Sequence, residues 1–91
     1  MNQTTLPKVP EIKFLVHQQI TNDDFVTEEF ETFRELYQWA ADESVINKQA
    51  REEYSDMGWD YHRKFTLMEY ISDHVFRLLE ENNYKVERIA K

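Results

Sequence analysis

The sequence has no cysteine, one glycine and two prolines among its 91 residues. The absence of cysteine excludes disulfides, thiolate nucleophiles and sulfur-ligated zinc or iron–sulfur sites, and it favours a cytoplasmic protein over a disulfide-stapled secreted one. With a single glycine, the chain cannot build the glycine-rich loops that cradle nucleotide phosphates. It is also poorly suited to a fold of many tight hairpins, because the favoured two-residue turns need positive φ angles. Helices are therefore expected to dominate.

Long hydrophobic runs are also lacking. No stretch approaches the ~18 consecutive apolar residues of a membrane-spanning helix, and the first residues have neither the basic region nor the apolar run of a signal peptide. We therefore expect no membrane partner. The hydrophobic fraction of 41% and the aromatic fraction of 14% are still ample for one small core.

Positive charge is scarce in one window of the chain, and this window accounts for the formal net charge of −7. Residues 1–20 carry two lysines and one glutamate, and residues 46–91 carry eight bases and nine acids. Residues 21–45 carry one base, Arg34, and eight acids: Asp23, Asp24, Glu28, Glu29, Glu31, Glu35, Asp42 and Glu43. Such a concentration of carboxylates repels phosphate and attracts a basic partner, so direct binding of nucleic acid is not expected.

Two interpretations of this acidic window stay open. The acids are either the solvated face of a first helix, or a surface that docks on a basic groove or imitates an array of phosphates. On the first predicted helix, Glu35, Asp42 and Glu43 fall within a limited arc. Tyr37 and Trp39 are candidate aromatic anchors for a partner, although Trp39 also suits the core.

Alternating side chains predict a strand at each end of the folded part. Apolar and polar residues alternate over 11–18 and again over 84–89. We therefore predict a helix-dominated α+β fold, in which two to three amphipathic helices pack on a small two- or three-stranded sheet formed by these strands. Residues 1–10, with both prolines and no periodicity, are predicted to be an extended flexible tail before a single globular domain at 11–91.

Helical spacing predicts the elements between these strands. The first helix begins at a capping box, Thr32 to Glu35, and is expected to end near Ser44. A second helical stripe runs from Ile46 to Met57, and Gly58 is expected to terminate it in the left-handed conformation.

The last helix is predicted to be the strongest, and the segment before it is the least regular. A second capping box, Thr66 to Glu69, starts the helix, and two asparagines can end it. Residues 25–30 are ambiguous between a strand and a helical turn. Residues 59–65 alternate as a strand would and also suit a helix that leads into the next element. Between these alternatives we favour a short connector whose aromatic side chains close one end of the core.

No constellation of residues indicates catalysis or metal binding. The three histidines, His17, His62 and His74, have no ligand partner at helical spacing, so no metal and no cofactor are expected. No serine lies in a glycine-framed nucleophile elbow. The weakest alternative is a small hydrolase-like enzyme that uses His74 or His62 with a nearby carboxylate.

The expected function is that of a small, acidic, non-catalytic regulatory protein. Its partner would be a protein with a basic surface, such as a nucleic-acid-binding protein, and residues 21–45 would contact it. Inhibitors that imitate DNA share this short, acidic, cysteine-poor, helical profile, and many come from phages or mobile elements; the likeness is one of composition. The alternative is a homo-oligomeric structural or assembly subunit, in which aromatic side chains form the interface.

Overall fold

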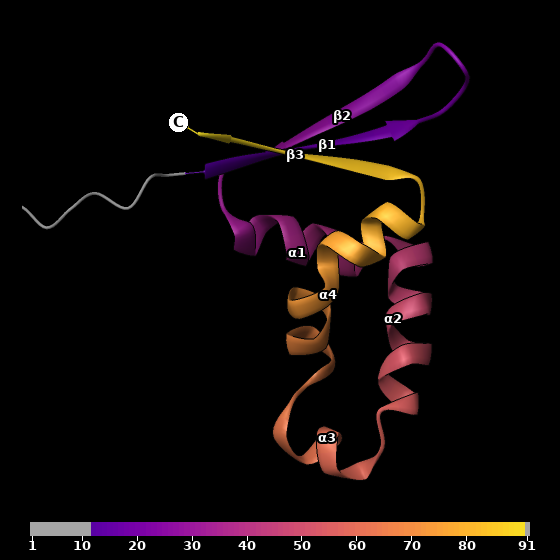
Figure 1. The fold of residues 1–91 in the computed structure, drawn as a ribbon, viewed down its shortest axis with the longest axis vertical. Helices are drawn as coiled ribbons and strands as arrows, with labels where there is room; N and C mark the ends of the chain where they lie inside the picture. The colour runs from indigo at the N-terminus through magenta and orange to yellow at the C-terminus, as the bar shows by residue number, and fades with distance from the viewer. Residues whose placement is uncertain (1–11, 91) are drawn as a thin grey trace, which may run out of the picture.

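Four helices and a three-stranded antiparallel sheet make up the part of the chain that the computed structural model describes, residues 12–90 (Figure 1). The elements in chain order are β1 Ile12–Gln19, β2 Phe25–Phe30, α1 Phe33–Asp42, α2 Ser44–Asp56, α3 Trp59–Lys64, α4 Leu67–Glu81 and β3 Tyr84–Ala90. The predicted α+β class, with the terminal strands paired in one sheet, is confirmed. The tail predicted at 1–10 lies outside the described residues.

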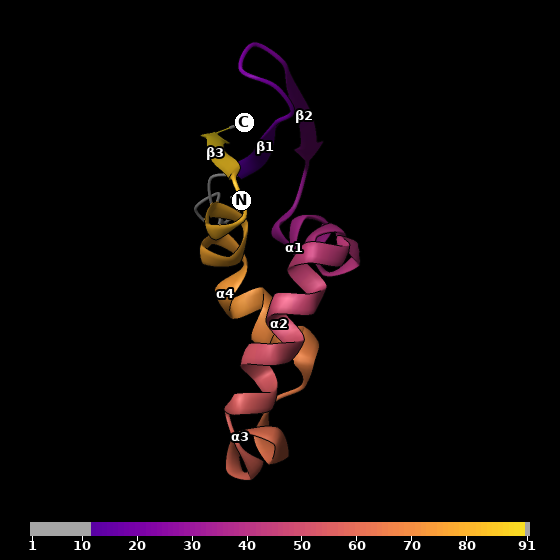
Figure 2. The same cartoon turned by 90° about the vertical axis from the view of Figure 1, so that its right-hand side faces the viewer.

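The sheet has the strand order β2-β1-β3, so the first strand lies in the centre (Figure 2). Because side chains alternate along a strand, Phe14 and Val16 of β1 point towards the helices and are buried, whereas Leu15 and His17 point to the opposite face. The helices lie on one side of the sheet only, and the β1–β2 hairpin extends beyond them (Figure 1). We call the face that carries His17 the open face.

The core lies between the inner face of the sheet and the helices α1 and α4, and α2 packs on these two helices. Its fully buried large side chains are Leu36, Ile46, Ile71, Leu78, Leu79, Val16 and Val75. Four of them belong to α4, at spacings of three or four residues that place them on one face of the helix. Each such side chain contributes roughly 1.5–3 kcal/mol when it is fully buried. The lower parts of α2 and α4 run away from the sheet as an arm, and α3 closes the arm (Figure 1).

The two predicted capping boxes differ in the structure. At α4, the Thr66 N–H donates to the Glu69 carboxylate (2.8 Å) and the Glu69 N–H donates to the Thr66 hydroxyl (3.1 Å), so this box is complete. At α1, the Thr32 hydroxyl accepts from the Glu35 N–H (3.1 Å), but the Glu35 carboxylate accepts from the Glu31 N–H instead (3.1 Å).

The helix ends lie within two residues of the predicted ones, but the roles of two residues differ. The first helix stops at Asp42, and Ser44 starts α2 rather than ending α1. The second helix ends at Asp56, and Gly58 has the predicted positive φ of 89° but a ψ of 173°, outside the left-handed helical region. Gly58 precedes α3 instead, and its carbonyl accepts from the His62 N–H (3.1 Å).

Residues 59–65 are not a connector that closes the core. They form the short helix α3, in which no residue is buried. Trp59 is 70% exposed, with the Arg63 guanidinium 4.7 Å above its ring. Tyr61 is partly buried and packs against the rings of Tyr54 and Tyr70. In the described residues, no helix combines the length and the hydropathy needed to cross a membrane.

Candidate functional site

The most exposed part of the acidic window is the end of the β1–β2 hairpin. We call residues 20–30, the turn and β2, the hairpin end. The N–H groups of Ile20 and Thr21 donate to the Asp24 carbonyl (2.9 and 3.3 Å), and the Thr21 hydroxyl bonds the Asp24 carboxylate (3.0 Å). The structure therefore contains the predicted turn. The turn holds the exposed carboxylate of Asp24 at the tip, next to the exposed Asp23.

The two acids of β2 point to opposite faces of the sheet. Glu28 lies opposite Val16 on the helix side, where the hairpin extends past the helices. Glu29 lies on the open face, 2.7 Å from the Lys13 ammonium group. The hydrogen bond to Glu29 raises the pKa of Lys13. Glu28 is therefore the β2 carboxylate with no ion pair among the described residues.

The remaining predicted acids lie at the two ends of α1. Glu31 and Glu35 meet at its start through the backbone hydrogen bond described above. Asp42 and Glu43 follow two helical turns later, about 10 Å along the axis. Burial raises the pKa of the Tyr84 hydroxyl, and the Glu43 carboxylate adds to this effect. The structure thus divides the eight acids between the hairpin end and the two ends of α1.

The predicted anchors Tyr37 and Trp39 are both partly buried and packed on the core. The Trp39 ring lies 5.1 Å from Phe30 and 5.6 Å from Tyr84, so it is part of the fold rather than a free anchor. The exposed apolar side chains of the hairpin end were missed by the sequence analysis. They are Ile20, Phe25 at 60% exposure and Val26 at 46%.

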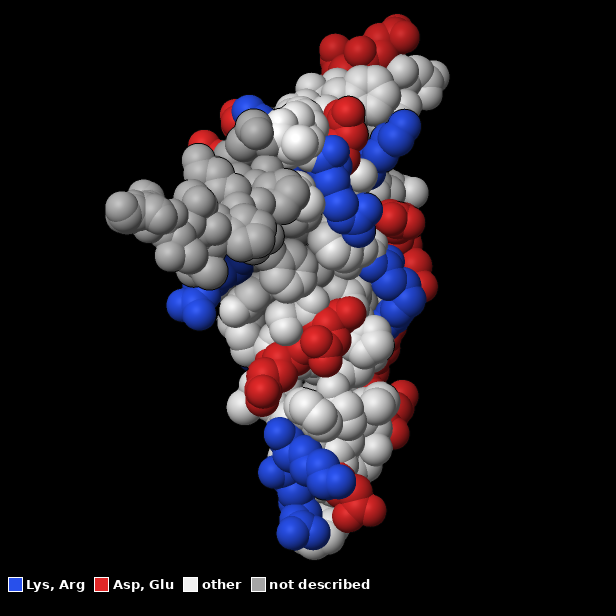
Figure 3. All heavy atoms as spheres, turned by 60° about the vertical axis from the view of Figure 1, so that its left-hand side comes forward, with Lys and Arg blue, Asp and Glu red and all other residues white. Residues whose placement is uncertain are grey.

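Charge is distributed unevenly along the molecule. In the view of Figure 3, acidic side chains gather at the hairpin end, at the top, and basic side chains gather at the opposite end, near α3. The last turn of α3 carries His62, Arg63 and Lys64. The acidic and basic ends are thus separated by the length of the arm.

A polar chain crosses the open face from strand to strand. The His17 imidazole lies between the Thr27 hydroxyl (2.8 Å from Nδ1) and the Glu87 carboxylate (2.8 Å from Nε2). Beside it is an open pocket of about 410 Å³ lined by His17, Phe25, Lys85 and Glu87. A hydroxyl, an imidazole and a carboxylate in this order can relay a proton, but Thr27 does not line the pocket. The geometry therefore supports a cross-strand link better than nucleophilic catalysis.

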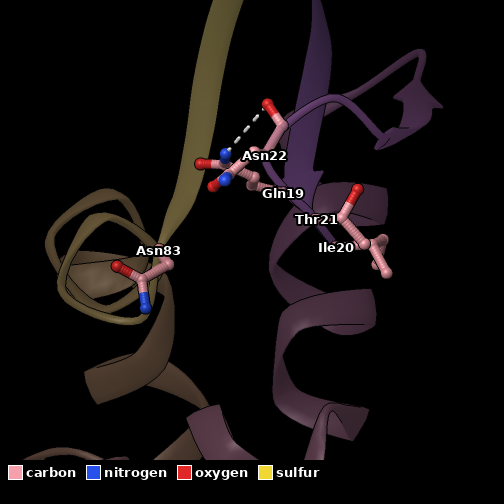
Figure 4. Close-up of a pocket in the computed structure, with 5 residues that line it drawn as sticks. All are labelled: Gln19, Ile20, Thr21, Asn22 and Asn83. Carbon is pink, nitrogen blue, oxygen red and sulfur yellow. Dashed lines mark hydrogen bonds between the residues drawn. The ribbon is translucent and has the colours of Figure 1, made fainter.

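A second pocket, of about 380 Å³, lies between the hairpin turn and the α4–β3 turn (Figure 4). Its lining is Gln19, Ile20, Thr21, Asn22 and Asn83, and the Gln19 amide donates to the Asn22 carbonyl (3.5 Å). None of these side chains carries a charge, so the pocket offers neither a metal ligand set nor a general acid or base.

The histidines of the enzyme alternative have packing roles in this structure. His62 stacks on Tyr54, and its Nε2 lies 2.6 Å from the Tyr54 carbonyl oxygen. His74 packs against the Tyr70 ring. Within residues 12–90, no group of three or more histidine, aspartate or glutamate side chains could hold a metal ion.

A carboxylate with a strongly lowered pKa joins α2 to α4. Glu53 accepts from the Arg77 guanidinium (2.6 Å), the Tyr70 hydroxyl (2.5 Å) and the Gln49 amide (2.9 Å). The bond from Arg77 lowers the pKa of Glu53 to about 2, and burial raises that of Tyr70 to about 12. The carboxylate is committed to this link between helices, so we assign it a structural role.

No protein-family model, no curated protein and no solved structure matches the chain.

Proposed function

We propose that the protein is a small non-catalytic binding protein that attaches to a basic protein partner through its hairpin end. The observation that carries the proposal is the combination found there: exposed carboxylates of Asp23, Asp24 and Glu28 beside the exposed apolar side chains of Phe25 and Val26. Interfaces that recognise a charged partner combine apolar contact area with complementary charge, which speeds association and selects the partner.

The distribution of charge favours a basic protein over a nucleic acid as the partner. Carboxylates at the hairpin end repel phosphate, and the bases near α3 are few and lie beside Asp60. A partner that itself binds nucleic acid presents the required basic groove. An inhibitor acting in this way occupies that groove by mass action, and this is the imitation of DNA expected from the composition.

The test is affinity capture from a host-cell extract with two charge-matched variants. The hairpin variant is Asp23→Asn/Asp24→Asn/Glu28→Gln. The control variant, Glu52→Gln/Asp56→Asn/Asp73→Asn, removes the same charge from exposed positions of α2 and α4. We expect the wild type and the control variant to retain the same basic proteins in mass spectrometry, and the hairpin variant to lose them.

Salt provides an independent measurement. Ion pairs at an exposed surface are screened over about 10 Å at 0.1 M salt, so recovery by the wild type must weaken as the salt concentration rises above this value. Equal recovery by the hairpin and control variants, or recovery that salt does not weaken, would contradict the proposal.

A homo-oligomeric assembly subunit is the second candidate, and a different surface favours it. Exposed apolar side chains gather where α3 joins its neighbours: Met57, Trp59, Phe65 and Met68. An exposed apolar cluster of this kind is typical of an interface. Light scattering at high protein concentration tests this candidate, because it requires a mass that is a multiple of 11.1 kDa.

A further inference from the structure

We infer that the partner binds as an extended basic strand, which adds to the free edge of β2 and extends the sheet by one strand. This inference rests on the proposed function and specifies how the hairpin end recognises its partner.

The outer edge of β2 is free in the part of the chain that the structure describes. β2 pairs with β1 along one edge, and within residues 12–90 no strand pairs with its other edge. In an antiparallel pair, every second residue of β2 directs its N–H and C=O groups away from β1. A free edge of this kind is a template for another chain, since main-chain hydrogen bonds supply affinity without requiring a particular sequence.

The free edge of β2 is also accessible. Five of the six residues of β2 are exposed, and only Phe30, next to α1, is partly buried. Figure 2 shows β2 at the outer side of the sheet, with β1 between it and β3. An incoming strand therefore meets no covering helix along the part of β2 nearest the turn.

The pattern of side chains along the edge of β2 defines the partner. Val26 and Glu28 share the helix-side face, whereas Phe25 and Thr27 share the open face. An added strand with an apolar side chain opposite Val26 has its next side chain on that face opposite Glu28. A lysine or arginine at this position pairs with the carboxylate, so the expected recognition element is an apolar residue and a base two positions apart.

Charge argues against a second copy of this chain as the added strand. Pairing β2 with β2 of another copy would bring together two sets of the same five acids, Asp23, Asp24, Glu28, Glu29 and Glu31, with no base in either segment. Like charges on paired strands destabilise a sheet. A basic strand neutralises the same carboxylates, so we favour it as the occupant.

The experiment measures binding of two peptides of about ten residues by fluorescence anisotropy. In the first, pairs of valines alternate with pairs of lysines (Val-Val-Lys-Lys), so that each face of the strand carries a valine and a lysine two positions apart. The second has the same lysines, but proline replaces every second valine, so it keeps the charge and cannot pair as a strand. We expect the first peptide to bind at least about tenfold more tightly. Hydrogen exchange should show that the amides of β2 that face away from β1 become protected only when the first peptide is bound.

Single variants test the predicted contact. Glu28→Lys should weaken binding of the first peptide about tenfold, because it places like charges opposite each other. Glu52→Lys, an equal change of charge on the exposed side of α2, should change it less than about twofold. Circular dichroism of Glu28→Lys should give the wild-type spectrum, which shows that weaker peptide binding is not caused by unfolding.

The other possible results distinguish a failure of the strand inference from a failure of the proposed function. If both peptides bind equally, lose affinity in the hairpin variant and leave the β2 amides unprotected, the strand inference is wrong and the acidic surface stands. If neither peptide binds, or if both peptides bind the hairpin variant as well as they bind the wild type, the strand inference and the proposed function are both wrong. Protection of β2 in the free protein together with a dimeric mass makes the occupant a second copy, which overturns the inference.

Discussion

At the scale of single residues, the molecule concentrates its strongest polar interactions away from the hairpin end. Arg77 contacts both oxygens of Glu53, at 2.6 and 3.2 Å, and also contacts Glu81 at 3.0 Å. The Gln49 amide joins the same two carboxylates, at 2.9 and 2.7 Å. These bonds fasten α2 to α4 along the arm, so part of the stability of the arm depends on the charge of Glu53.

Glu53→Gln should lower the free energy of unfolding by about 1–2 kcal/mol at pH 7, since bonds to a charged acceptor are replaced by bonds to a neutral one. The pKa of Glu53 is lowered from 4.5 to about 2 in the fold, so its stabilisation is complete above pH 4.5 and disappears as the pH falls towards 2. Urea unfolding at several pH values should show the difference between wild type and variant shrinking over that range. Glu52→Gln, one position earlier and exposed, is the control and should show no such dependence.

Gly58 is the one residue whose backbone demands glycine. Its φ of 89° and ψ of 173° lie in a region that other residues rarely adopt. A Cβ atom would meet nothing within 4 Å, so the cost of Gly58→Ala is conformational strain rather than a clash. We expect a loss of about 1–3 kcal/mol in thermal or urea unfolding. Met57→Ala, at an exposed neighbour with ordinary helical angles, should cost under about 0.5 kcal/mol, and an equal loss in both variants would contradict this assignment.

At the scale of elements, helix starts are the features that local sequence determines most directly. Thr66→Ala removes the hydroxyl that accepts the Glu69 N–H, and it should lower stability by about 1 kcal/mol. Thr66→Ser keeps the hydroxyl and should stay close to wild type. Chemical denaturation of the two variants measures the difference. A loss of similar size in the serine variant would mean that the threonine methyl group, not the cap, matters.

The same scale shows why some elements could be predicted and others could not. The strands at 11–18 and 84–89 and the helix from Thr66 have strong apolar periodicity, and the structure places them within one or two residues of the predicted bounds. β2 and α3 bury almost no side chains. Their sequences therefore lack the apolar periodicity that distinguishes a strand from a helix. Both had to be seen in the structure.

The candidate site was predictable in composition but not in arrangement. Counting charges identified the acids of residues 21–45, because net charge needs no fold. The split of Glu28 and Glu29 between two faces depends on strand register, which the sequence leaves undetermined. The same holds for the link from His17 to Glu87, which joins residues 70 positions apart. The exposure of Phe25 follows from its position on the open face, which is opposite the helices and is a property of the whole fold.

At the scale of the whole molecule, two different surfaces occupy opposite ends. The hairpin end is acidic, and the end at α3 carries exposed apolar and basic side chains (Figure 3). Attraction between an acidic surface and a basic partner weakens with salt, whereas association through apolar surface does not. The two candidate functions therefore differ both in location and in their response to salt.

Sites this far apart should act independently, and a pair of variants tests this. Trp59→Ser removes the most exposed aromatic side chain of the α3 end, at 70% exposure, and should leave binding of a basic peptide within about 0.5 kcal/mol of wild type. The hairpin variant should abolish peptide binding and leave the sedimentation mass unchanged. If the chain is an assembly subunit instead, sedimentation gives a multiple of 11.1 kDa that persists at high salt and is reduced by Trp59→Ser. If either variant changed both the peptide binding and the sedimentation mass, the two ends would form one surface.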